Sequence, residues 1–207
     1  MTRNIGQFGI DLEGQIRKEL GTATPISWKE EVNETHQSSK STRNDVLAAI
    51  WGGKLGIRGL LVFDLPASCP TQLRTGIIQP GINSCVATLH FSTDLRKPIN
   101  GKITFVKNNS GIGRFEGNAS LCELMNTQKE IVSIASALYR EKYTLGNLTV
   151  KINPQLALES DGDSTHLDLL TVPYFKKKFI TGTIIYSVKE YLQLASLIDT
   201  ALSESGR

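Results

Sequence analysis

Apolar and polar residues alternate along several stretches of the chain, which is the pattern of half-buried β-strands. The clearest example is 85–91, where one face collects Cys85, Ala87, Leu89 and Phe91. Residues 103–105 repeat this alternation after a turn-rich connection at 94–101. Together the two stretches predict a β-hairpin with a long connection.

Two later stretches change to the helical period, with apolar residues recurring about every 3.6 positions. Ser120 and Ser187 each precede such a stretch, and each is followed three residues later by a glutamate. A serine and a glutamate at this spacing form a capping box, which marks the start of a helix. We therefore expect one helix at 120 to about 142 and a second at 187 to about 203.

Further runs of apolar and β-branched residues predict four more strands, at 55–64, 145–152, 165–172 and 178–186. A short helix is expected at 45–51, where it ends at two glycines. The strands alternate rather than staying apolar throughout, which favours a sheet with one exposed face. The sequence thus predicts an α+β fold, with a largely antiparallel β-sheet core and two to three packed helices.

Residues 1–43 differ from the rest because they contain few large apolar side chains and include a polar tract at 30–43. This composition predicts a flexible N-terminal arm or linker, followed by an α+β core domain at 44–207. Ile26 and Trp28 are the apolar exceptions, and we expect them to dock on a neighbouring subunit and mediate self-association. The alternative is that they pack on the core of their own chain.

Composition limits the class of protein. The chain has 207 residues and a hydrophobic fraction of 40%, enough for one domain with a sizeable core. Its net charge of +3 is small, so only local clusters of charge are informative. Cys69, Cys85 and Cys122 lack metal-binding spacing and are expected to be reduced. There is no apolar signal region and no run of about 18 apolar residues, which predicts a soluble, cytoplasmic protein.

The main candidate binding site is a cluster of basic and aromatic residues ahead of the second helix, formed by Tyr174, Phe175, Lys176, Lys177 and Lys178. Lysines can contact phosphates, while rings can stack on bases or lie at a lipid headgroup boundary. Arg96 and Lys97 would extend this cluster if the fold brings them close. The alternative is an edge strand that lysines protect against aggregation.

One acidic segment is the best candidate for catalysis. Residues 161–168 contain Asp161, Asp163, His166 and Asp168, which could ligate a divalent cation. The spacing does not fit an EF-hand, and Asp-Gly is itself a turn signal, so a polar hairpin loop is the favoured interpretation. The glycines at 110–117 likewise indicate a turn, because no nucleotide-binding context surrounds them.

These observations predict a non-enzymatic structural or assembly protein, with no catalytic residue, cofactor, metal or small-molecule substrate. Its layout of polar arm, β-rich core and basic cluster is typical of assembly proteins such as viral matrix or shell subunits. We expect it to form homo-oligomers and to contact an anionic membrane surface, as a peripheral protein, or nucleic acid. The alternative is a small metal-dependent hydrolase that uses the segment 161–168.

Overall fold

The computed structural model describes most of the chain from residue 56 onwards. The described residues are 14, 17, 26–29, 56–65, 70–79, 86–108, 110–140, 142–145, 148–151, 154–160, 165–175 and 181–205. The expected helix at 45–51, the polar tract at 30–43 and the three lysines at 176–178 lie outside them.

Eight of the ten described strands form one antiparallel sheet. In spatial order they are β1 (Ile26–Lys29), β2 (Gly56–Asp64), β3 (Gln72–Gln79), β4 (Val86–Leu95), β10 (Thr165–Phe175), β9 (Gln155–Ser160), β5 (Lys102–Lys107) and β6 (Gly113–Gly117). Every neighbouring pair is antiparallel. β10 contains Pro173, which pairs with Thr88 of β4 and lies beyond residues 165–170, where β9 pairs with β10.

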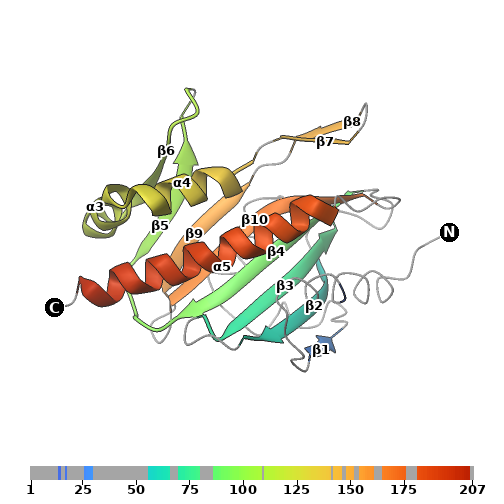
Figure 1. Cartoon of the computed structure of the whole chain (residues 1–207), viewed down its shortest axis with the longest axis horizontal. Helices are drawn as coiled ribbons and strands as arrows, with labels where there is room; N and C mark the ends of the chain where they lie inside the picture. The colour runs from blue at the N-terminus through green and yellow to red at the C-terminus, as the bar shows by residue number, and fades with distance from the viewer. Residues whose placement is uncertain are drawn as a thin grey trace.

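Three helices lie on one face of the sheet: α3 (Ala119–Thr127), α4 (Lys129–Leu138) and α5 (Thr181–Glu204). α5 runs across the middle of the sheet, and Figure 1 shows α3 and α4 beside it over β5 and β9. Tyr191 of α5 is fully buried, with its ring centroid 5.7 Å from that of Phe91 and its hydroxyl donating to the Leu167 carbonyl. These contacts confirm the predicted α+β class, a sheet with helices packed on it.

The hairpin expected from 85–91 and 103–105 is wrong, although both stretches are strands. β4 and β5 do not pair with each other, because β10 and β9 lie between them in the sheet. β4 pairs with β10, and β5 pairs with β9. Alternation predicts that a segment is a strand but not which strand it pairs with. The next strand along the chain therefore need not be its partner.

The single helix expected at 120–142 is wrong, because the chain forms two helices separated at Gln128. Gln128 has extended backbone angles (φ −85°, ψ 93°), and Met125 and Ile131 on either side are both buried. In an unbroken helix six residues span about 600°, which would point these two side chains about 120° apart. The break lets both enter the core.

The predicted N-terminal cap of the first helix is also wrong, since the cap is Asn118 rather than Ser120. The Asn118 side chain accepts a hydrogen bond from the Leu121 backbone N–H at 3.2 Å. Asparagine caps a helix as well as serine does, and Asn118 is the residue that directly follows β6.

The strand expected at 178–186 is wrong as well, because α5 already begins at Thr181. Its β-branched residues favour a strand locally, but such propensities amount to less than about 1 kcal/mol per residue and tertiary packing overrides them. Ser187 therefore lies inside α5 instead of capping it. The buried residues Val188, Tyr191 and Ala195 follow at helical spacing.

A separate hairpin replaces the strand expected at 145–152. β7 (Lys142–Leu145) pairs with β8 (Leu148–Lys151) in a two-stranded sheet of its own. This hairpin projects from the body of the protein in Figure 1. The sequence prediction also missed β3, where Gly76 interrupts the alternation, and β9, whose burial pattern does not alternate.

A buried carboxylate ties α5 to the connection between β4 and β5. Asp199 is about 1% exposed and accepts hydrogen bonds from the Arg96 backbone N–H at 2.9 Å and from Arg96 Nε at 2.8 Å. The next residue, Lys97, donates from Nζ to the Leu202 carbonyl at 2.6 Å, near the end of the same helix. Arg96 and Lys97 thus hold α5 against the sheet.

Removing Arg96 should destabilise the fold more than neutralising its partner. Arg96→Ala leaves the buried Asp199 carboxylate with fewer donors, and we expect a loss of about 2–3 kcal/mol in the free energy of unfolding. Asp199→Asn removes the buried charge while the Arg96 side chain, 58% exposed, can still be hydrated, so the loss should be about 1 kcal/mol.

Urea denaturation of both variants measures this difference. Arg114→Ala is the matched control, because Arg114 pairs with Glu116 at the exposed surface and its loss should cost less than about 0.5 kcal/mol. An Asp199→Asn variant that is less stable than Arg96→Ala would contradict the expected order.

Candidate functional site

The sheet face away from the helices carries a row of charged groups. Asp94, His166, Glu159 and Lys102 occupy directly opposite positions on β4, β10, β9 and β5. Their neighbours along these strands, such as Leu95, Leu167 and Leu158, are buried in the core. Because successive residues of a strand face opposite sides, the charged row must lie on the other face.

Ion pairs join the members of this row. The Arg74 guanidinium on β3 binds both carboxylate oxygens of Asp94, with Nη1 donating to Oδ1 at 3.0 Å. His166 Nδ1 lies 2.6 Å from the same Oδ1 atom. Further along, Lys102 Nζ donates to Glu159 Oε2 at 3.0 Å. The face is therefore charged but internally compensated.

A second imidazole and carboxylate pair lies beside this row and is more deeply buried. His90 Nε2 is 3.0 Å from Asp168 Oδ1, and both residues are less than a tenth exposed. The pair joins β4 to β10 at diagonal positions of the ladder. A carboxylate that holds an imidazole sets its tautomer and orientation, which is the arrangement used in proton transfer and also in purely structural networks.

The surroundings of two titratable groups shift their pKa values in opposite directions. Burial raises the pKa of Asp94, but hydrogen bonds from His166 and Arg74 and their positive charges outweigh it and hold that pKa well below its usual range. Burial, and then the charge of Glu116, raise the pKa of the Cys122 thiol. Asp94 is thus ionised at neutral pH beside Arg74 and His166, while the Cys122 thiol is protonated and weakly nucleophilic.

Two residues of the predicted catalytic segment, His166 and Asp168, form the imidazole and carboxylate pairs described above. Residues 161–164 lie outside the described part of the chain, and they join β9 to β10, whose ladder ends at Ser160 and Thr165. His166 and Asp168 face the same side of β10, but each bonds to a different residue of β4. Among the described residues, no group of three His, Cys, Asp or Glu could hold a metal ion. The hydrolase hypothesis stays a prediction.

The fold separates the residues predicted to form the basic cluster. Tyr174 and Phe175 end β10 opposite the start of β4, whereas Arg96 and Lys97 follow the other end of β4. A strand of ten residues spans roughly 30 Å, so the two groups lie at opposite ends of this strand pair. Arg96 is also engaged with Asp199, and binding of an anionic partner by any of these residues stays a prediction.

The expected anchors of the N-terminal arm fall in β1. Ile26 and Trp28 pair with Phe63 and Leu61 of β2, at the end of the sheet opposite β6. Their backbones are therefore part of this chain's own sheet. Self-association through these residues stays a prediction.

Sequence reasoning missed the charged row because its members come from five strands. Two pairs left a partial signal in the sequence: Asp94–His166 and, beside the row, His90–Asp168. In both, the histidine lies in a stretch where apolar and polar residues alternate. No protein-family model matches the chain, nor does any curated protein or solved structure. Within the described part of the chain, no helix is long and apolar enough to cross a membrane.

Asp94 should make the stability of the protein sensitive to acid. Its pKa in the folded protein lies below the unfolded value of about 3.9, so its stabilising contribution is complete above that pH and decreases as the pH falls further. Asp94→Asn removes this contribution. Between about pH 4 and pH 3, unfolding free energies should decrease more steeply for the wild type than for Asp94→Asn, and equal slopes would show that Asp94 is not the responsible group.

Proposed function

We propose that this chain is a non-enzymatic assembly protein that binds an anionic lipid surface with one end of its long axis. Three segments support this proposal by lying at the same end in Figure 1: the β7–β8 hairpin, the end of β10 and the start of α5. Lys176, Lys177 and Lys178 follow β10 directly in sequence and precede α5.

The observation that carries the proposal is the register of the projecting hairpin. Lys142 lies directly opposite Lys151, so two like charges occupy one cross-strand pair. Like charges at directly opposite positions destabilise a strand pair, and an isolated two-stranded hairpin is only marginally stable in water. An anionic surface that neutralises both lysines would offset this repulsion and stabilise the hairpin.

The same register favours a lipid surface over nucleic acid. Tyr143 lies opposite Val150, and Leu145 lies opposite Leu148, while the lysine pair and a Thr144–Thr149 pair alternate with them. Apolar and polar pairs therefore alternate along the hairpin, which is the sequence pattern of an amphipathic element. Amphipathic elements with lysines and a tyrosine are suited to the headgroup boundary of a membrane.

Several basic residues in the body of the protein make internal contacts. Lys107 donates to the carbonyls of Ser136 and Tyr139 at 2.7 and 2.9 Å, at the end of α4. Lys102 pairs with Glu159 and Arg74 pairs with Asp94. Cations held in this way would lose these contacts on binding phosphate, so the hairpin and the segment before α5 are the better candidates for a lipid contact.

Replacing Lys176, Lys177 and Lys178 by alanine should weaken binding to anionic vesicles about a hundredfold. Each lysine near an anionic surface contributes roughly 1 kcal/mol, and three such contributions correspond to about two orders of magnitude in affinity. Sedimentation with phosphatidylserine-containing vesicles measures the loss, and added salt should reduce wild-type binding through screening.

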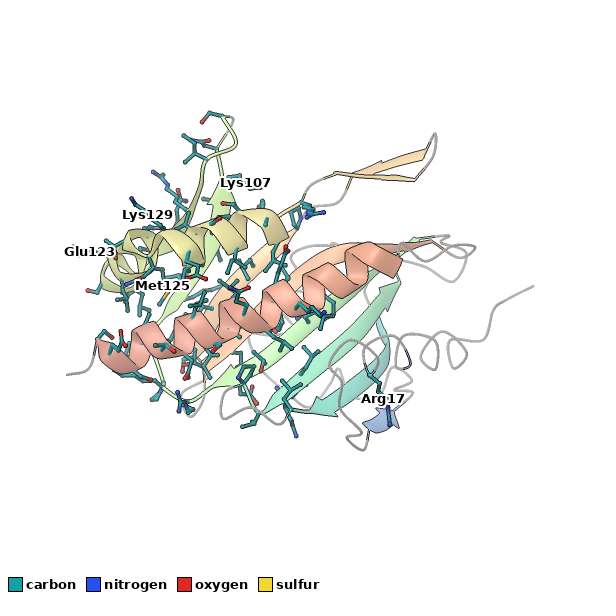
Figure 2. The ribbon with its side chains drawn as sticks, viewed as in Figure 1. Arg17, Lys107, Glu123, Met125 and Lys129 are labelled. Atoms are coloured by element: carbon teal, nitrogen blue, oxygen red, sulfur yellow. The ribbon has the colours of Figure 1, made fainter. Side chains whose placement is uncertain are left out.

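Lys129→Ala is the control, because this exposed lysine of α4 lies at the other end of the protein from the hairpin (Figure 2). Its vesicle binding should match the wild type. If the triple variant binds vesicles normally, the proposal is wrong. If it loses affinity for single-stranded nucleic acid but not for vesicles, the partner is a nucleic acid.

We also propose that the chain forms homo-oligomers through Ile26 and Trp28 at the β1 end of the sheet. Large aromatic residues dominate the energetics of protein interfaces, so Trp28→Ala should lower the oligomeric mass measured by light scattering. Far-ultraviolet circular dichroism checks that the sheet is retained. A folded variant with an unchanged mass would exclude Trp28 as the anchor.

A further inference from the structure

A side chain from α3 covers the outer edge of β6, which is the last strand of the described sheet. Asn126 Oδ1 accepts a hydrogen bond from the Phe115 backbone N–H at 2.8 Å, and Asn126 Nδ2 donates to the Phe115 carbonyl at 2.9 Å. Because both groups bond to Asn126, they point away from β5. The asparagine amide thus makes the two hydrogen bonds that a neighbouring strand would make.

Local structure places Asn126 beside the middle of β6. Gly117 ends the strand with φ 133°, and a Cβ atom there would lie 2.3 Å from the Lys102 carbonyl oxygen, so only glycine fits this turn. Asn118 then caps α3, whose residue Met125 is fully buried in the core. With Met125 anchored, the next residue meets Phe115, the central residue of the five in β6.

The sequence of β6 is complementary to itself. It reads Gly113, Arg114, Phe115, Glu116, Gly117, so an antiparallel pair of two copies centred on Phe115 would place Arg114 of each opposite Glu116 of the other. Opposite charges at such positions stabilise a strand pair. Within one chain the same residues are exposed and pair with each other, Arg114 Nε lying 2.8 Å from Glu116 Oε1.

We propose that β6 is a self-association strand for a second copy of this chain, and that Asn126 keeps it closed in the single chain. Unpaired edge strands are templates for pairing, and proteins cover them by several means. Here the Asn126 amide occupies both edge groups of Phe115, and an incoming β6 would have to displace this amide and the end of α3 that carries it. This surface is at the opposite end of the sheet from Ile26 and Trp28, and it does not involve lipid.

Asn126→Ala should open the edge of the full-length protein. We expect sedimentation velocity to show a dimer with a dissociation constant at least about tenfold lower than that of the wild type, because two intramolecular hydrogen bonds no longer compete. Hydrogen exchange gives a local readout: the Phe115 amide should lose protection in dilute solution and regain it as protein concentration rises. Glu123→Ala, at another exposed position of α3, should behave as wild type.

Charge reversal identifies the surface that associates. Adding Arg114→Glu to Asn126→Ala would place two acidic side chains at each of these cross-strand positions and should abolish the dimer. Adding both Arg114→Glu and Glu116→Arg restores opposite charges and should restore the dimer. Neither result depends on binding at the lysine-rich end, so failure of the lipid proposal leaves this test intact.

Two results would overturn the proposal. One is a folded Asn126→Ala variant with wild-type mass and no concentration dependence in Phe115 exchange. The other is association that is insensitive to both charge variants. Asn126→Asp keeps the shape and the acceptor but loses the donor to the Phe115 carbonyl, so it makes the same comparison if the alanine variant does not fold.

Discussion

Burial of one side of α5 against β4 and β10 is the interaction on which the rest of the structure depends. Tyr191, Leu194 and Ile198 are fully buried on this helix, and Asp199 beside them anchors Arg96. Once the helices take one face of the sheet, every second residue of the central strands must lie on the other face. The charged row from Arg74 to Lys102 follows from this division, because its partly exposed side chains lie on the face that the helices leave open.

The fold class was predictable because it depends on local patterns. Alternation along β4 and β5 indicated strands, and helical spacing around Ile131 and Tyr191 indicated helices. Element boundaries were less predictable, since they depend on packing. The cap at Asn118 and the early start of α5 at Thr181 both contradict the strongest local signals, the two capping boxes, and the break at Gln128 interrupts a helical pattern.

The candidate site was hardly predictable, because its contacts join residues far apart in the sequence. Asp94 and His166 are separated by 72 positions, His90 and Asp168 by 78, and Arg96 and Asp199 by 103. A single sequence suggested that 161–168 was a local cluster. In the structure, His166 and Asp168 contribute instead to two separate pairs with β4. The sequence shows that these residues are present, but their partners follow only from the register of the strands.

The strand order has a consequence for how the chain folds. β4 and β5 are consecutive in sequence, yet β10 and β9 lie between them in the sheet. The meander from β1 to β4 and the group of β5, β6 and β9 therefore meet only through β10, which begins at Thr165. During synthesis the edge of β4 that pairs with β10 stays unpaired until β10 has been made. Pairing over such sequence separations is also slow. Before β10 arrives, two partial sheets coexist with open inner edges, and this interval is when the chain is most exposed to aggregation.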